Sequence, residues 1–517
     1  MNFSQKTTFS NYFGTVFANF TIQNSSIMNA TMIQFFHWYS DGNAQLYNQA
    51  KDSTAYLKEL GISAVWFPPA YKANGGGYSV GYDPYDLFDL GEFDQKGTIP
   101  TKYGSKEQYM NACKTLQENG ISVIADIVLN HKAGGDEKEK FHAVKVDPQN
   151  RQQNISDPFE IESYTKFTFP NRQKKYSDFE WNFTCFSGVD YAEGQEEGIF
   201  QIIHDFGDGW EEMIDDEKGN YDYLMYNDID HRNPFVREEL DKWGKWYHDQ
   251  IHFDGVRLDA VKHQSPVFYK EWLYKLRGNT GKNIFAVGEY WAPGELPLLQ
   301  NYIEATEGCM SLFDSSLQQN FHLASKQGAD YDLRKIFDET LTLENPAFSV
   351  TVVDNHDTQP LQDLEAPVEK WFKPLAYALI LLRENGYPCI FYPDLFGAHY
   401  TDKDKEGNDQ EIFLDKVEKI EELLKARQQF AYGTQRDYFE DANCLGWTRE
   451  GNDEHAGCAV VLSNKDAYEK PMEMGEKYAG KQFYDFMGWF PDTVTIDDNG
   501  WGNFPVPAGN VSVWVPQ

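Results

Sequence analysis

The segment Phe253-Asp254-Gly255-Val256-Arg257-Leu258-Asp259-Ala260-Val261-Lys262-His263 is the most informative stretch of the chain. Its apolar residues predict a short buried strand that ends in charged residues. Residues two apart in a strand share a face, so Arg257 and Asp259 point the same way. A buried arginine would lower the pKa of Asp259 and keep it ionised as a nucleophile. A buried salt bridge that only stabilises the fold explains this segment equally well.

Seven further short apolar runs occur along the chain, and helical stretches follow them. Alternating strands and helices are typical of a parallel βα architecture. Ser265 and Pro266 mark the start of one helix, and Pro374 starts another that we expect to close at Gly386. The pattern predicts an α/β fold, a (β/α)8 TIM barrel whose active site lies where the strands end. The predicted strands are Met32–His37, Ser63–Phe67, Ser122–Val128, Asp254–Leu258, Ile284–Gly288, Ser311–Phe313, Ser349–Asp354 and Cys389–Tyr392.

Other parts of the chain depart from this alternation. After the third strand, a long stretch rich in polar, aromatic and acidic residues predicts a domain inserted in a barrel loop. After the helix Lys416–Gln429, short alternating runs with Gly and Asn turns predict a C-terminal antiparallel β-sandwich domain. The predicted segments are 1–28 (an N-terminal extension of unknown role), 29–130 and 233–430 (barrel), 131–232 (inserted domain) and 431–517 (C-terminal domain).

The composition limits the classes of ligand. The 517 residues include 46 basic and 81 acidic ones, which gives a formal charge of −35, and 16% are aromatic. Such a charge repels phosphate groups and argues against nucleic acid or an anionic membrane as partner. No apolar run approaches the length of about 20 residues that spans a bilayer. We therefore expect a neutral or cationic ligand, and we expect a monomer.

Cysteine usage and the start of the chain bear on the cellular compartment. The six cysteines are scattered and include no CxxC pair, unlike the dense disulfide framework of a small secreted protein. Before residue 30 the only charged side chain is Lys6, and the basic and apolar regions of a secretory signal are missing. The sequence therefore predicts a cytoplasmic protein.

Two more acids follow predicted strands as Asp259 does. Glu289 follows Ala286-Val287-Gly288 and precedes two aromatic residues, whose rings would desolvate it and suit a general acid. Asp357 follows His356 at the end of the seventh strand. Each acid alone could be an ordinary strand-end group that faces water. Three acids at the carboxyl ends of three barrel strands converge on one point, so together they predict a catalytic site.

Two segments carry oxygen-bearing side chains that suit a cation. Asn130-His131 follows the third strand, where such a pair usually caps the backbone. The segment Tyr221–Asp230 contains three acids, and calcium takes six to eight oxygen ligands of this kind. Taken alone, a solvated acidic loop is the simpler explanation of the second segment.

Four of these segments, at the ends of the third, fourth, fifth and seventh strands, resemble the four hallmark regions of the α-amylase family of glycoside hydrolases. They occur in the family's order, and the resemblance covers almost the whole chain from about Met32. The stretch Gly77–Phe93 resembles the liquefying-type bacterial enzymes. Glu365–Glu369 and Phe391–Tyr400 resemble the cytoplasmic branch of that group.

The resemblance implies a role for each site residue. Asp259 would be the nucleophile, Glu289 the general acid/base and Asp357 the third carboxylate, which stabilises the transition state and binds sugar hydroxyls. Arg257 would hold Asp259 ionised. The other substrate-binding residues implied are Tyr82, stacked on the sugar at the cleavage subsite, His131 and His356, hydrogen-bonded to that sugar, and Lys262 and His263 on the leaving-group side.

The resemblance also implies one structural Ca2+ that ties the inserted domain to the barrel. Its ligands would be Asn130, Asp222, Asp228 and the backbone carbonyl of His263. Extracellular relatives often bind additional metals. The ligands expected for those metals are replaced here by Ser187 and Glu211 in the inserted domain and by Asn443 and Asn464 near the C-terminus. We therefore expect one calcium ion rather than a cluster.

The implied function is endo-acting, retaining hydrolysis of internal α-1,4-glucosidic bonds in starch, glycogen and maltodextrins through a covalent glycosyl-enzyme. The implied partners are neutral α-glucan polysaccharides and maltooligosaccharides, in line with the charge. One alternative is an α-glucan transglycosylase or branching enzyme of the same family, in which a sugar hydroxyl replaces water. Another is a carbohydrate-binding protein without catalysis. Such proteins usually lack a catalytic carboxylate, whereas Asp259, Glu289 and Asp357 are all present here.

Overall fold

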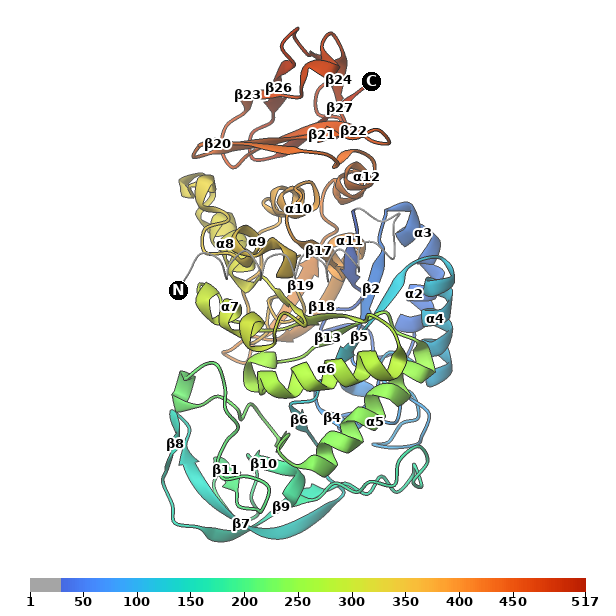
Figure 1. Ribbon diagram of the computed structural model, residues 1–517, viewed down its shortest axis with the longest axis vertical. Helices are drawn as coiled ribbons and strands as arrows, with labels where there is room; N and C mark the ends of the chain where they lie inside the picture. The colour runs from blue at the N-terminus through green and yellow to red at the C-terminus, as the bar shows by residue number, and fades with distance from the viewer. Residues whose placement is uncertain (1–28) are drawn as a thin grey trace.

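Eight parallel strands close into a barrel in the computed structural model, which describes residues 29–517 (Figure 1). All eight predicted strands and the barrel are confirmed, and the extension 1–28 lies outside the described residues. Around the barrel the order is β1 (Met32–Gln34), β17 (Tyr387–Phe391), β16 (Ser349–Val352), β15 (Ser311–Phe313), β14 (Phe285–Gly288), β13 (Gly255–Leu258), β5 (Ser122–Ile127) and β2 (Ala64–Phe67).

Helices surround the barrel and connect its strands (Figure 1). α4 (Lys106–Glu118) begins with a capping box in which the Ser105 side chain and the Gln108 side chain bind each other's backbone N–H. α6 (Pro266–Thr280) starts at the predicted proline, although the Ser265 side chain makes no capping hydrogen bond. The other helices are α2 (Leu46–Asp52), α3 (Thr54–Glu59), α5 (Pro234–Ile251), α7 (Leu296–Ala305), α8 (Ser315–Gln327), α9 (Leu341–Glu344), α10 (Lys373–Leu381), α11 (Tyr392–Phe396) and α12 (Ile420–Phe430).

The prediction that Gly386 closes the helix after Pro374 is wrong. α10 already ends at Leu381, and Gly386 directly precedes β17. Its φ is +80°, and a Cβ at this position would lie 2.8 Å from Cγ2 of Thr351 on β16. The glycine is therefore required where β16 and β17 start side by side.

The inserted domain is an antiparallel sheet between β5 and α5, at the carboxyl end of the barrel (Figure 1). Its strand order is β6 (His131–Lys132), β12 (Asn227–Ile229), β10 (Phe186–Val189), β11 (Ile199–Ile202), β7 (Glu137–Asp147) and β8 (Asn150–Asn154), and β9 (Phe159–Lys166) also pairs with β7. β6 begins shortly after β5 ends and pairs with β12, so this edge of the domain starts at the carboxyl ends of the barrel strands.

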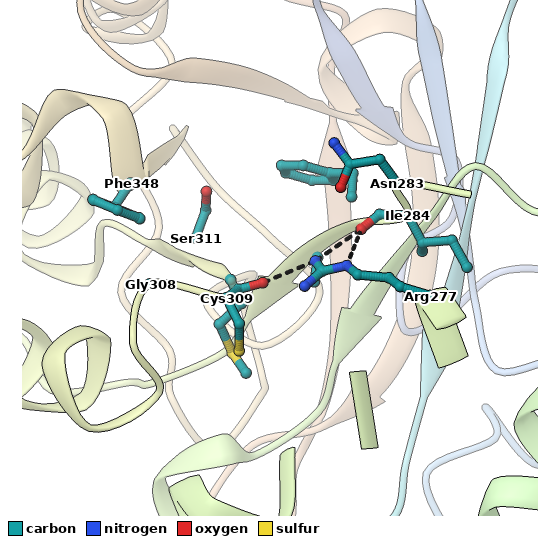
Figure 2. Close-up of a pocket in the computed structure, with 10 residues that line it drawn as sticks. Arg277, Asn283, Ile284, Gly308, Cys309, Ser311 and Phe348 are labelled. Carbon is teal, nitrogen blue, oxygen red and sulfur yellow. Dashed lines mark hydrogen bonds between the residues drawn. The ribbon is translucent and has the colours of Figure 1, made fainter. Parts of the chain in front are cut away.

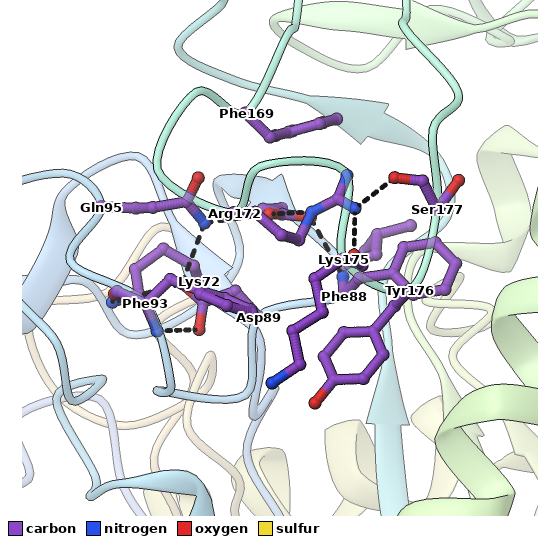
Figure 3. Close-up of polar contacts among 12 residues, drawn as sticks. Lys72, Phe88, Asp89, Phe93, Gln95, Phe169, Arg172, Lys175, Tyr176 and Ser177 are labelled. Carbon is purple, nitrogen blue, oxygen red and sulfur yellow. Dashed lines mark hydrogen bonds and ion pairs between the residues drawn. The ribbon is translucent and has the colours of Figure 1, made fainter.

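A buried polar network fixes the segment after β2 to the inserted domain (Figure 3). Arg172 of the inserted domain donates from Nε to Asp86 at 2.8 Å. Gln95 donates to both Asp86 and Asp89, at 2.9 and 3.0 Å, and Lys72 lies 3.5 Å from Asp89. These charges are satisfied by one another, as buried charges must be. The segment that contains β3 (Lys72–Ala73), β4 (Pro84–Asp86) and Tyr82 is thereby held against the inserted domain.

The C-terminal domain is an antiparallel sandwich, as predicted. One sheet has the order β20 (Gln435–Asp441), β21 (Cys444–Gly451), β22 (Ala456–Ser463), β27 (Val511–Pro516), β24 (Gln482–Asp485) and β25 (Val494–Thr495), and the other pairs β23 (Tyr468–Glu473) with β26 (Trp501–Val506). Met472, Phe504 and Trp514 pack between the sheets. Asn464 donates to the carbonyls of Gly328 and Tyr331 at 2.9 Å, so an amide links this domain directly to the barrel.

The amino-terminal end of the barrel contains a small cavity of about 50 Å³ (Figure 2). Arg277 of α6 reaches across it and donates to the carbonyl of Ile284 from Nε and Nη2 and to that of Cys309 from Nη2, at 2.8 to 3.0 Å. These contacts join α6 to the starts of β14 and β15. The cavity lies at the strand starts, and the candidate site lies at the opposite ends of the same strands.

A hairpin after α11 was not predicted from the sequence. It consists of β18 (Ala398–Lys403) and β19 (Asp409–Leu414). Tyr400 of β18 stacks on Tyr39 with ring centroids 4.0 Å apart, so the hairpin covers the segment after β1. No helix within residues 29–517 is long and apolar enough to cross a membrane.

Candidate active site

Arg257 is the centre of the candidate site, because three carboxylates contact its side chain. It is only 1% exposed, and its Nη1 donates to Asp259 at 2.6 Å and to Asp126 at 3.0 Å. Nη2 donates to Glu289 at 2.5 Å. The parallel register pairs Arg257 with Asp126 on β5 and places Glu289 just beyond the end of β14. The structure therefore brings together the predicted nucleophile and the predicted acid on one guanidinium.

Asp126 is a site residue that the sequence analysis missed. It is fully buried and accepts hydrogen bonds from Trp66 Nε1 at 3.0 Å and from the Tyr82 hydroxyl at 2.7 Å. Burial raises the pKa of Asp126 to about 6, although the charge of Arg257 opposes this shift. The available signal was a carboxylate inside the otherwise apolar strand Ser122–Ile127. Asp126 holds both Arg257 and Tyr82 in position.

Glu289 has the environment of a general acid. Its backbone N–H donates to Leu258 O at 2.9 Å, and its carbonyl accepts from Val261 N at 3.0 Å, which fixes it beside the end of β13. Burial raises the pKa of Glu289 to about 7, because the charge of Arg257 offsets only part of the desolvation and Asp259 adds repulsion. A carboxyl group that holds its proton near neutral pH can donate it to a leaving group.

Asp357 and His356 lie on the other side of the site. Burial and the charge of Glu289 raise the pKa of Asp357 well above its ordinary value. Burial and the charge of Arg257 lower the pKa of His356 well below its ordinary value, so the imidazole is neutral. Its Nδ1 accepts from Gln34 Nε2 at 2.9 Å, which leaves the proton on Nε2, 3.3 Å from Asp357 Oδ2. Gln34 was also missed by the sequence analysis.

Aromatic rings form a wall beside these carboxylates. The rings of Tyr82 and His356 stack with centroids 5.0 Å apart and planes inclined by 13°. Trp38 stacks on Tyr82 at 6.1 Å with an interplanar angle of 3°. Tyr82 therefore belongs to an aromatic surface beside the carboxylates, and Trp38, which was not predicted, extends this surface.

The remaining predicted binding residues make contacts between the barrel and the inserted domain. His131 Nε2 lies 2.8 Å from the carbonyl of Tyr82, so the ring nitrogen donates this hydrogen bond. Lys262 and His263 lie on the 3-10 turn Val261–His263 directly after β13. His263 Nδ1 donates to Tyr221 O at 2.8 Å, and burial lowers the pKa of His263 to about 3. The turn therefore joins the barrel strand to the inserted domain.

Three of the predicted calcium ligands, Asn130, Asp222 and Asp228, lie near one another. The Asn130 amide lies 3.4 Å from Asp228, and its Oδ1 is buried without a partner among the described residues. Burial raises the pKa of Asp222 and Asp228, and negative neighbours (Glu211 for Asp222, Asp222 for Asp228) raise both pKa values further. Ser187 donates to Asp228. Two buried carboxylates and an orphaned amide oxygen form a donor set that fits a calcium ion.

Within residues 29–517, no group of three or more acidic, His or Cys side chains could hold a metal ion. The predicted set has only two side-chain carboxylates, and the other oxygens come from an amide and a backbone carbonyl. A cation at this place would therefore depend on neutral oxygens as well as on carboxylates.

Comparisons with known proteins find relatives that match almost the whole chain. The family model described as alpha amylase, catalytic domain, matches residues 51–483, and the alpha-amylase C-terminal model matches residues 458–515. The chain is 50% identical over 489 residues to the cytoplasmic alpha-amylase of Escherichia coli (strain K12), covering 94% of this chain and 99% of that one. It is 44% identical over 492 residues to an alpha-amylase of Bacillus licheniformis, covering 95% and 94%.

A solved structure gives the same fold. The alpha-amylase of Geobacillus thermoleovorans in complex with acarbose superposes with a TM-score of 0.62 at 17% identity, covering 95% of this chain and 98% of that one. The catalytic-domain model spans most of the chain, and the relatives align with it almost from end to end. The chain therefore belongs to the alpha-amylase family.

Proposed function

We propose that this protein hydrolyses internal α-1,4-glucosidic bonds in starch, glycogen and maltodextrins by an endo-acting, retaining mechanism. The observation that carries the proposal is the pair Asp259 and Glu289 on one buried guanidinium. Two carboxyl groups bridged in this way are close neighbours, and retaining glycosidases need a separation of about 5–5.5 Å. The relatives named as alpha-amylases support the same activity.

The reaction proceeds in two displacements. Glu289 transfers its proton to the glycosidic oxygen while the Asp259 carboxylate attacks the anomeric carbon, which forms a covalent glycosyl-enzyme and releases the shortened chain. Glu289, now ionised, takes a proton from water, and the hydroxyl attacks the same carbon and frees Asp259. Arg257 donates a hydrogen bond directly to the Asp259 carboxylate and so orients the nucleophile before it attacks.

Substrate binding uses the wall opposite this pair. Tyr82 stacks on the apolar face of the sugar at the cleavage site, and the carboxylate of Asp357 binds its hydroxyl groups. His356 and His131 add hydrogen bonds to the same sugar. A neutral ligand suits the site, because a phosphorylated one would be repelled by the overall negative charge of −35. We therefore assign neutral α-glucans and maltooligosaccharides as partners, bound by a monomer.

Digestion of maltoheptaose by the purified protein tests this function. Hydrolysis should release shorter maltooligosaccharides whose new reducing ends have the α configuration at first, because two inversions restore it. Products with the β configuration would exclude the covalent mechanism. Longer chains or new α-1,6 linkages as the main products would instead assign the protein to the transglycosylases or branching enzymes.

The rate should depend on the ionisation of Glu289. Because the acid must be protonated in the first displacement, and burial raises its pKa to about 7, activity should fall as the pH rises through about 7. The measurement is kcat/KM for maltoheptaose between pH 4 and 9, since this constant reports the free enzyme. A basic limb with its midpoint near 4.5, the ordinary value for a glutamate, would contradict the assignment.

We also propose that one structural Ca2+ is held by Asn130, Asp222, Asp228 and the carbonyl of His263. The bound ion supplies positive charge to two buried carboxylates and ties the inserted domain to the barrel, which orders one wall of the cleft. Removing it with EGTA should lower the melting temperature by roughly 5 °C or more, and Ca2+ should restore it better than Mg2+.

Differential scanning fluorimetry checks this expectation without relying on activity. Asp228→Asn should raise the Ca2+ concentration needed to restore the melting temperature, whereas Asp415→Asn, at an exposed carboxylate that pairs with Lys370, should not. A melting temperature unchanged by EGTA would show that the protein holds no structural calcium ion.

We place the protein in the cytoplasm. All six cysteines are unpaired, and five of them are buried, which suits a reducing compartment. A relative of 50% identity is named a cytoplasmic alpha-amylase. Activity recovered mainly outside the cytoplasmic fraction of fractionated source cells would overturn this proposal.

A further inference from the structure

Two acids of the inserted domain form ion pairs with the ammonium group of Lys262. Lys262 Nζ lies 2.7 Å from Glu217 Oε2 and 3.3 Å from Asp215 Oδ2. The Lys262 and Asp215 side chains are only 13% and 9% exposed, whereas that of Glu217 is 45% exposed. Lys262 therefore has one buried partner and one that water reaches. We call Asp215 and Glu217 the acidic clasp.

The acidic clasp has a defined geometry. Asp215 Oδ1 accepts the backbone N–H of Glu217 at 2.8 Å, so one carboxylate both faces Lys262 and orients the second acid. Lys218, the next residue, has a left-handed φ of 52°, which turns the chain back toward the inserted domain. Gln152 of β8 then donates to Gly219 O at 2.9 Å. The fold of the loop thus places the Glu217 side chain beside Lys262.

The acidic clasp lies near Glu289, the group that donates a proton to the leaving chain in the proposed mechanism. Lys262 is three residues beyond Asp259, and the N–H of Ala260, between them, lies 3.3 Å from the Glu289 carboxylate. Tyr290 follows Glu289 directly, and its pKa is raised by burial and then by the charges of Asp215 and Glu217. The two acids therefore lie near the residues that flank the proton donor.

We propose that the acidic clasp sets how tightly the leaving-group side of the cleft holds a glucan, with Asp215 as a positioning residue and Glu217 as a competitor for Lys262. The Lys262 ammonium group has three N–H donors. A sugar hydroxyl can accept one of them only if the carboxylate that now accepts it is easily displaced. Exposed ion pairs contribute little, so Glu217 can give way to the substrate, while buried Asp215 keeps Lys262 aimed into the cleft. This inference rests on the proposed hydrolysis of α-glucans.

Steady-state kinetics of the full-length protein with maltotetraose, and bond cleavage frequencies on maltoheptaose labelled at its reducing end, test the proposal. Glu217→Gln should lower KM about two- to fivefold, the factor expected from losing one exposed ion pair, with little change in kcat. It should also shift cleavage toward bonds that place more glucose units on the leaving-group side. Asp215→Asn should raise KM, because Lys262 loses its buried partner.

Asp216→Asn is the matched control, because Asp216 is an exposed acid on the same loop with no ion pair to Lys262 among the described residues. It removes the same charge, so it should keep the wild-type KM and cleavage pattern. Melting temperatures of all three variants show whether the loop remains folded. Equal KM and cleavage patterns for Glu217→Gln and Asp216→Asn would overturn the proposal, as would a higher KM for Glu217→Gln. A wild-type protein without hydrolytic activity would instead refute the proposed function.

Discussion

Asp259→Asn should lower kcat for starch hydrolysis by at least about 10⁴-fold, as losses of catalytic nucleophiles do. The amide is nearly the same size as the carboxylate but cannot attack the anomeric carbon. It still accepts a hydrogen bond from Arg257, so the site should keep its shape and bind maltoheptaose with an affinity within a few-fold of wild type. The checks are the rate of reducing-end release and calorimetric titration with maltoheptaose.

Asp254→Asn is a suitable control, because it makes the same chemical change at the other end of the same strand. Asp254 accepts from Val123 N at 3.0 Å, a contact that the amide oxygen of Asn can also make. We expect activity near that of wild type. Substantial turnover by Asp259→Asn would show that another group attacks the sugar and would remove Asp259 from the mechanism.

Glu289→Gln should lower the rate on starch by about 10²- to 10⁴-fold, the usual contribution of a general acid. The loss should be much smaller for formation of the glycosyl-enzyme from α-maltosyl fluoride, because fluoride leaves without a proton. Added azide, which needs no general base, should then react with the intermediate to give a maltosyl azide of retained α configuration. Product analysis by NMR spectroscopy distinguishes this outcome.

Glu295→Gln provides the comparison, since Glu295 is an exposed acid in the loop that follows the same strand. It should behave as wild type on both substrates. If Glu289→Gln lost the same factor on starch and on the fluoride, its carboxyl group would be shaping the site rather than transferring the proton.

The barrel could be predicted because its strands are buried on both faces and read as short apolar runs. β5 and β17 are examples, with almost every residue buried. β19 could not be found in this way, because its sequence DQEIFL is largely exposed and is a strand only through pairing with β18. β23 contains Pro471 and alternates with charged residues. Such strands depend on their partners more than on their own propensities.

In the candidate site, too, some residues could be predicted from the sequence and others could not. Asp259, Glu289 and Asp357 could be predicted, because strand ends in a barrel converge whatever the details of packing. Asp126 and Gln34 could not, since their roles come from contacts to Arg257 and His356 that only the barrel register creates. The clasp residues Asp215 and Glu217 sit in a loop whose path no sequence pattern indicates.

The network of Arg172, Asp86, Asp89, Gln95 and Lys72 has a consequence for engineering. It couples two stretches of chain that are far apart in sequence, and one of them carries Tyr82. A chimera that took residues 131–232 from a relative without an arginine at position 172 would leave the buried Asp86 without its cationic partner. The stretch 72–95 and the inserted domain therefore form one module. Recombination between homologues should exchange the two together.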